Sequence, residues 1–318
     1  MTMYGALLDY FYTTLKEEIS FLETQRLEAY ARVKSSRVYW ALGAGLLFLV
    51  FVNTLFKEEH LFALFFALTL GGAGCMLHEK HLTRTFRGLF KEHLIGRMVE
   101  HLGLSYAPQG HVSPHMFRQA AFFARDFDTY GGDDLVKGNI AGVEVTWSDV
   151  KATYTTKNAK GKSTRHTLFE GLFFMAPFPR LFHKKTWVLP DVAQKILGDF
   201  GTLVQGLDRR GALVKLDNPN FERAFVVFSE DQIEARYLLS PVMMERLLAL
   251  KNHAKTPLHV SFIAGHIFLG FSYGKPSFEP ALSQPLGAFK TVEKHAQMLA
   301  LMYGIVEALG LKSPHEAG

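Results

Sequence analysis

The chain has 318 residues, of which 48% are hydrophobic and 20% are charged, and its formal net charge is +5. This length allows one large domain or two smaller ones. The small net charge argues against nucleic acid as a partner, because nucleic-acid-binding domains concentrate basic residues on one face. The single cysteine, Cys75, excludes an intrachain disulfide bond, which is typical of proteins in a reducing compartment.

Two amphipathic helices are predicted in the first third of the chain. Residues 1–37 form the first, which we expect in the cytosol, because apolar side chains recur there every three to five positions and charged ones fill the opposite face. Residues 78–105 show the same pattern, which ends at Gly103. These helices either pack on each other as a stalk or bind a partner helix, and the sequence leaves both arrangements open.

Two uncharged runs, residues 38–56 and 61–77, predict a transmembrane hairpin. Helices of this length reach roughly 28 and 26 Å, close to the ~30 Å hydrocarbon thickness of a bilayer. The polar residues from Lys57 to His60 then form the turn, because a charge near the bilayer centre costs about 2.5–3.5 kcal/mol. The alternative is a pair of buried core helices in a soluble protein. Close packing of the two spans is supported by small residues at spacings of four, namely Ala41 and Gly45, and Ala67, Gly71 and Cys75.

The charges that flank the two runs predict their orientation. Four basic residues between positions 26 and 37 precede the first run, and five between positions 80 and 97 follow the second, whereas the turn holds only Lys57. The positive-inside rule therefore places both flanks, and with them both termini, in the cytoplasm.

A cytosolic α+β domain is predicted for residues 106–318. Because strands mostly follow strands through short turns, we expect a mixed, mainly antiparallel sheet with helices. Hydrophobic patterning predicts strands at 143–147, 152–156, 165–175 and 224–228, a hairpin at 259–273 that turns at Ala264 and Gly265, and a closing helix at Phe289–Leu309.

Turn and cap residues predict further boundaries within this domain. Residues 130–134 have the composition of a turn, and residues 190–201 predict a helix. Ser229 is the expected cap of a helix that begins with a capping box. Ser240 before Pro241 predicts the start of another helix.

Residues 270–274 match the G-x-S-x-G pattern of serine hydrolases. A nucleophile elbow needs a helix after the serine, and Pro276 and Pro280 argue against one, so the end of a strand is the simpler interpretation. A hydrolase that uses Ser272 with His295 stays as the alternative. No Walker or dinucleotide pattern is present. We therefore predict no cofactor and no metal site, and an enzyme is the less favoured class.

The first candidate binding site is a surface for a protein partner. Its residues are Asp231, Glu234, Arg236 and Tyr237. Local helix capping and a surface ion pair are the simpler interpretation of the same residues.

The second candidate binding site is a basic hairpin tip that could contact anionic membrane lipid, at about 1 kcal/mol per basic residue near the surface. Its residues are Lys157, Lys160, Lys162 and Arg165. A solvated turn is the alternative interpretation, because hairpin tips are normally polar.

Three segments resemble an uncharacterised bacterial family of two-span membrane proteins, catalogued as domain of unknown function 3137: TLFEGLFFMAPFPRLFHKKTWVLPD at 167–191, FERAFVVFSEDQIEARYLLSPVMMERLLAL at 221–250 and VSFIAGHIFLGF at 260–271. The resemblance implies a protein of the bacterial inner membrane and suggests a LemA-type membrane protein as partner. It supplies no catalytic residues. We therefore predict a membrane-anchored, non-enzymatic scaffold or protein-interaction module.

Overall fold

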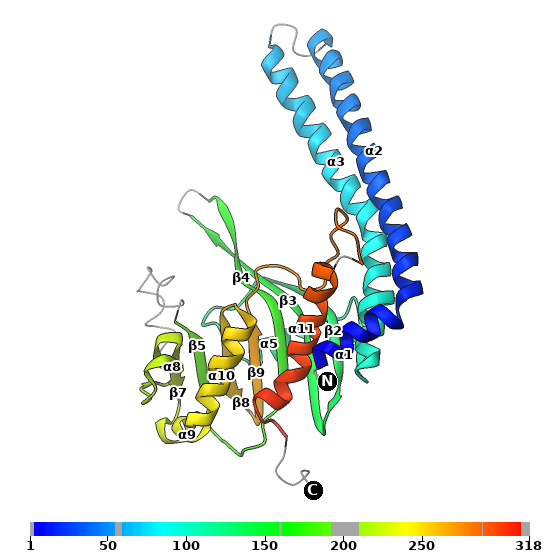
Figure 1. Ribbon diagram of the computed structural model, residues 1–318. Helices are drawn as coiled ribbons and strands as arrows, with labels where there is room; N and C mark the ends of the chain where they lie inside the picture. Colours follow the sequence, from blue (N-terminus) through cyan, green and yellow to red (C-terminus); the bar gives the residue numbers. More distant parts are fainter. Residues whose placement is uncertain (1–2, 55–58, 159–160, 192–209, 288, 313–318) are drawn as a thin grey trace. The chain divides into compact units, whose positions relative to one another are not determined.

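The computed structural model describes residues 3–54, 59–158, 161–191, 210–287 and 289–312 (Figure 1). The chain divides into two compact units. The helical unit comprises residues 6–97 and 279–294, and the sheet unit comprises residues 98–278 and 295–318 together with residues 1–5.

Helices fill most of the chain up to His101. They are α1 (Met3–Thr13), α2 (Lys16–Thr54), α3 (His60–Phe90), the π-helical η1 (Lys91–Gly96) and α4 (Arg97–His101). The predicted amphipathic segments continue into the apolar runs as parts of α2 and α3. No proline interrupts either helix, so the backbone hydrogen-bond ladder continues through the change in composition. The prediction of one helix over residues 1–37 is wrong, because the helix is interrupted between Thr13, where α1 ends, and Lys16, where α2 begins.

The helices α2 and α3 lie side by side as an antiparallel hairpin (Figure 1). Ala67 and Gly71 are buried, as their spacing predicted, and a Cβ atom on Gly71 would lie 2.7 Å from the Cβ atom of Ala44. The partner positions on α2 differ from the prediction. Ala41 and Gly45 are exposed, and Ala44 faces Gly71 instead. Small side chains still allow the two backbones to approach closely.

A segment from near the end of the chain is bound to the helices of this unit by charged contacts. Glu279 pairs with Arg87, whose Nε lies 2.6 Å from Oε2, and with Lys91 at 3.7 Å. The guanidinium of Arg26 donates to the carbonyl of Leu282. Residues near 280 are therefore part of the helical unit although almost two hundred positions separate them from α3.

The described part of the sheet unit forms one nine-stranded sheet, in which every pairing is antiparallel, and the predicted α+β class is confirmed. The order across the sheet is β1-β2-β3-β4-β9-β8-β5-β7-β6. The strands are β1 (Ser105–Ala107), β2 (Thr129–Ile140), β3 (Val143–Lys157), β4 (Ser163–Pro177), β5 (Thr186–Pro190), β6 (Ala212–Val214), β7 (Phe225–Ser229), β8 (Leu258–Ile263) and β9 (His266–Phe271).

In the part of the chain that the structure describes, the strands are accompanied by the helices α5 (Pro114–Gln119), α8 (Pro219–Ala224), α9 (Gln232–Leu238), α10 (Pro241–Ala254) and α11 (Phe289–Ala308), of which α11 belongs to the sheet unit from His295 onward. Both faces of the sheet are covered. On β4, Phe169 and Phe173 pack with Phe117 of α5 in one apolar cluster, and the alternate residues Leu172 and Phe174 are buried on the opposite side.

Several predicted boundaries are confirmed and others are wrong. The hairpin β8–β9 turns at Ala264 and Gly265, which both have positive φ, as a two-residue hairpin turn requires. Residues 130–134, predicted as a turn, belong to β2 instead, because residues 130–133 pair with β3 and Asp134 lies in the bulge that follows. Ser229 is not a helix cap; Asp231 caps α9. The predicted helix at 190–201 falls almost entirely outside the described residues.

Candidate functional site

The surface around α9 contains all four residues of the first predicted binding site. Asp231 caps the helix, since its Oδ1 accepts hydrogen bonds from the amides of Ile233 at 2.7 Å and Glu234 at 3.0 Å. These amides hold the pKa of the Asp231 carboxyl below its usual value. The capping interpretation of Asp231 therefore agrees with the geometry.

Glu234 has a different role, because it binds the loop between β4 and β5. Its two carboxylate oxygens accept from the amides of His183 at 2.8 Å and Lys184 at 2.6 Å. Glu230 accepts from the amide of Lys185 at 3.2 Å in the same way. The carboxylates thus fix the β4–β5 loop along α9, a function that the sequence spacing did not reveal.

Arg236 and Tyr237 complete this surface. Arg236 donates to the carbonyls of Gln232 and Lys215, at 3.1 and 3.2 Å, so the predicted ion pair with Asp231 is not among its described contacts. Tyr237 is 55% exposed, and the guanidinium of Arg180 lies 5.5 Å from the centre of its ring. The surface therefore combines a cation–π pair with carboxylates that are engaged by backbone amides.

Two large apolar side chains at the same surface are almost fully exposed, and the sequence analysis missed both. Leu181, in the β4–β5 loop, is 89% exposed, and Ile233, on α9, is 82% exposed. Ile233 and Tyr237 are four residues apart on the helix and so share one face. Contiguous apolar patches mark interaction sites, whereas single exposed apolar side chains are common on protein surfaces.

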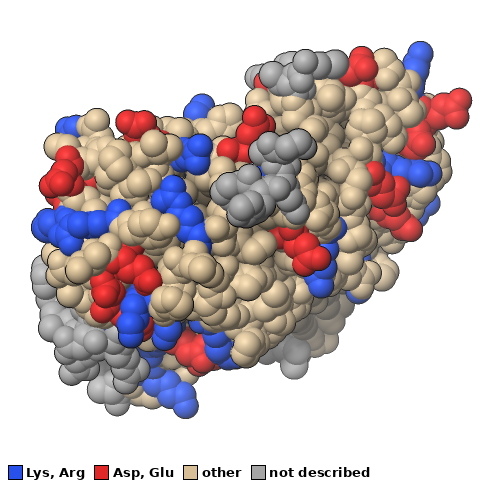
Figure 2. Space-filling model, turned by 90° about the horizontal axis from the view of Figure 1, so that it is seen from below, with Lys and Arg blue, Asp and Glu red and all other residues tan. Residues whose placement is uncertain are grey.

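The basic hairpin tip lies at the end of β3 and β4. Lys157 pairs with Ser163 and Arg165 with Thr155 in the strand register, whereas Lys162 follows the turn. Lys157, Lys162 and Arg165 are exposed, and Lys160 lies outside the described residues. On the face drawn in Figure 2, basic and acidic side chains are interspersed among uncharged ones, without a continuous area of one sign.

Ser272 and His295 are placed in different settings. Ser272 directly follows β9, and residues 272–287 contain no helix. His295 is buried on α11, where its ring stacks on Phe278. No hydrogen bond between Ser272 and His295 is among the contacts of the described residues. The geometry that a nucleophile elbow requires, a serine at a sharp turn from strand to helix, does not occur at Ser272.

A cluster of three carboxylates lies at the bulge between β2 and β3, and sequence reasoning did not find it. Each of Asp133, Asp134 and Asp149 offers one oxygen within 4.8 Å of the others. Tyr106 donates to Asp134, while the amide and hydroxyl of Ser277 donate to Asp149 at 2.5 and 2.7 Å. These donors already stabilise the buried charges. The strand register that joins Asp133 to Asp149 cannot be read from the local sequence.

Two buried basic residues lie in the apolar interior of the sheet unit. His259 packs against Phe122, Phe123 and Phe169, and burial lowers its pKa to about 4. Burial also lowers the pKa of Arg210 to about 10, and this guanidinium donates to the carbonyl of Phe122 at 2.8 Å. His259 is therefore neutral at physiological pH, which suits a place in the core better than a role in proton transfer.

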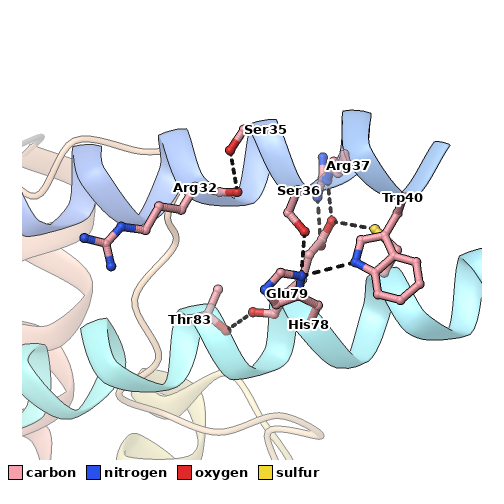
Figure 3. Close-up of polar contacts among 9 residues, drawn as sticks. Arg32, Ser35, Ser36, Arg37, Trp40, His78, Glu79 and Thr83 are labelled. Atoms are coloured by element: carbon pink, nitrogen blue, oxygen red, sulfur yellow. Dashed lines mark hydrogen bonds and ion pairs between the residues drawn. The ribbon is translucent and has the colours of Figure 1, made fainter. Parts of the chain in front are cut away.

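A polar cluster joins α2 to α3 at one end of the apolar runs (Figure 3). Arg37 forms a two-pronged ion pair with Glu79, at 2.6 and 3.1 Å. The indole of Trp40 donates to Nδ1 of His78 at 3.1 Å, and Ser36 Oγ lies 3.0 Å from the same nitrogen. Because an indole nitrogen can only donate, Nδ1 of His78 is an acceptor and the ring proton is on Nε2. These contacts fix the register of the two helices.

Comparison with curated proteins finds no match. A solved structure, the crystal structure of the mycobacterial trehalose monomycolate transport factor A, TtfA, is similar to this chain, with a TM-score of 0.35 and 9% sequence identity, over 66% of this chain and 91% of that chain. Residues 167–311 match the family described as "Protein of unknown function (DUF3137)". Over this segment, which is less than half of the chain, the match agrees with the family that the sequence resembles.

Proposed function

We propose that this protein is a membrane-anchored, non-enzymatic interaction module of the bacterial inner membrane. In this proposal the hairpin of α2 and α3 crosses the bilayer twice, and the sheet unit lies in the cytoplasm and binds a protein partner. The observation that carries the proposal is the outward exposure of the apolar side chains of the hairpin.

The two helices are long and apolar enough to cross a membrane. In the most apolar 18-residue stretch of each helix, only 6% of the first and 17% of the second is buried. Leu42 and Leu46 on α2, and Leu61 and Leu77 on α3, are each at least 66% exposed. In water, each such side chain would forgo about 1.5–3 kcal/mol of burial energy. Lipid as the surrounding solvent removes this cost, and a pair of core helices in a soluble protein would be buried.

The surface around α9, with Leu181, Ile233 and Tyr237 exposed, supports the proposal that the protein binds a partner. It presents ordered apolar and aromatic side chains, and the carboxylates Glu230 and Glu234 are hydrogen-bonded to backbone amides. The setting of Ser272, with no helix after it, favours a binding role over hydrolysis. The LemA-type membrane protein suggested by the family resemblance is the partner we propose to test first.

Cysteine labelling in intact cells tests the anchor and its orientation, because Cys75 is the single cysteine of the chain. In a Cys75→Ser background, Glu59→Cys places a thiol at the hairpin turn and Lys275→Cys places one on the sheet unit. We expect a membrane-impermeant maleimide to label Glu59→Cys from outside, and to label Lys275→Cys only after the inner membrane is permeabilised. The background without added cysteine should not react.

Extraction of membranes at alkaline pH completes this test. The full-length chain should stay with the lipid pellet and dissolve only in detergent. A chain that is released without detergent contradicts the proposed anchor. A Lys275→Cys thiol that reacts from outside contradicts the proposed orientation.

A further inference from the structure

We infer that the α9 surface, formed by Arg180, Leu181, Lys184, Ile233, Arg236 and Tyr237, is the docking site for an acidic, apolar segment of a protein partner. This inference rests on the proposed function and adds to it the place of binding and the chemistry of what binds.

The β4–β5 loop holds Leu181 rigidly at the surface. Its neighbour Phe182 is buried, with its ring 6.1 Å from that of Phe178 and 6.3 Å from that of Phe262. On the same side of Leu181, the amides of the next two residues, His183 and Lys184, donate to the carboxylate of Glu234. Before Leu181, Phe178 is buried and its amide donates to the carbonyl of Gly265 at 2.8 Å. The loop is therefore fixed on both sides of Leu181, yet that side chain is 89% exposed. A surface ordered before binding loses little conformational entropy when a partner docks.

The residue types at this surface are those found at protein interfaces. Tyrosine and arginine are enriched among the residues that dominate the energy of protein interfaces. Here the guanidinium of Arg180 lies over the ring of Tyr237 and donates to its carbonyl at 3.2 Å. The pair is thus held in one geometry on the face of α9 that also presents Ile233.

The cations of this surface favour an acidic partner segment. Among the described residues, no carboxylate lies within ion-pair distance of Arg180 or Arg236, whose guanidinium groups donate to backbone carbonyls. Lys184 acts on the carboxylate of Asp231 only through its charge, since that carboxylate accepts from the amides of α9. A guanidinium beside exposed apolar groups matches a partner segment that carries aspartate or glutamate next to apolar residues. An anionic bilayer would also meet these cations, but the ordered Arg180–Tyr237 pair favours a protein.

Site-specific photo-crosslinking in living cells tests the inference on the full-length chain. The probe is p-benzoylphenylalanine, introduced at Leu181 or Ile233, and at Glu144 as an exposed control position on β3. We expect the first two positions to form an adduct with the same protein, and Glu144 not to form it. Mass spectrometry of the adduct should place the cross-link in a segment with both apolar and acidic residues.

Charge reversal gives the second measurement. With the probe at Ile233, Arg180→Glu should reduce the adduct at least about tenfold, the effect of losing ~1.4 kcal/mol of binding. The matched variant Lys275→Glu reverses an exposed charge outside this surface and should leave the yield unchanged. Thermal unfolding of both variants in detergent establishes that the chain is folded.

The other outcomes overturn the inference. One is an adduct with lipid, with a second copy of the chain or within the same chain. Another is an adduct with a basic or uncharged segment of a partner. A third is a cross-linking yield at Leu181 and Ile233 that is no higher than the yield at Glu144. If instead a partner cross-links only at Glu144, the proposed interaction function stands and the location inferred here is wrong. If maleimide labelling and alkaline extraction contradict the anchor, the proposed function itself fails.

Discussion

Substitution of Gly71 by alanine should separate the two helices of the hairpin. The added Cβ atom would lie 2.7 Å from the Cβ atom of Ala44, whereas carbon atoms in contact are about 3.5–4.0 Å apart. The helices must therefore move apart by about 0.8 Å or more, because neither a helix backbone nor an alanine side chain can rotate away. Overpacking of this kind costs about 1–3 kcal/mol.

The matched control is Gly72→Ala, on the same helix, where a Cβ atom would have no neighbour within 4 Å. Alanine should stabilise the helix there by about 0.5–1 kcal/mol, through its higher helix propensity. The two variants are thus expected to change the stability of the hairpin in opposite directions, although their chemistry is identical.

The assay is a titration of the full-length chain in micelles with SDS. Nitroxide labels at Tyr39→Cys on α2 and Met76→Cys on α3, in a Cys75→Ser background, report the separation of the helices, since both positions are more than 70% exposed. Gly71→Ala should separate them at a lower SDS fraction than the parent, and Gly72→Ala at an equal or higher one. Equal midpoints for Gly71→Ala and the parent would refute the close approach at Gly71.

Three further predictions concern the sheet unit, each measured by thermal unfolding in detergent. Because burial lowers the pKa of His259 from 6.5 to about 4, the unfolded chain binds a proton in this range that the folded chain does not. The free energy of unfolding should fall as the pH drops from 6.5 towards 4, by up to roughly 3 kcal/mol, and His259→Phe should remove this part; an unchanged pH dependence would contradict it. Gly132→Ala should destabilise the unit, since its Cβ atom would meet the carbonyl oxygen of Asp149 at 2.1 Å, whereas Gly131→Ala, with no neighbour within 4 Å, should not; equal losses would show that the contact is unimportant. Ser272→Ala keeps the hydrogen bonds that the backbone amide and carbonyl of this position form with Pro257 and Thr256, so the midpoint of its thermal unfolding should match that of the parent. Labelling of Ser272 by a fluorophosphonate probe would support the hydrolase hypothesis instead.

The sequence alone determined the features that depend on local pattern. The apolar run at 38–56 forms the C-terminal part of α2 as far as Thr54, where the described residues stop, and the run at 61–77 forms the N-terminal half of α3. Ala264–Gly265 became a hairpin turn. Apolar periodicity, helix length and turn chemistry act over a few neighbouring residues, and so they can be read from the chain itself.

Only the tertiary structure decided which distant residues meet. The strand register places Asp133 opposite Asp149, and the burial of Phe182 leaves Leu181 exposed. Glu234 has the spacing of a surface helix residue, yet it binds the β4–β5 loop fifty positions earlier. Such contacts depend on which strands pair and on what the loops pack against, and these are choices of the whole fold, which no local pattern in the sequence specifies.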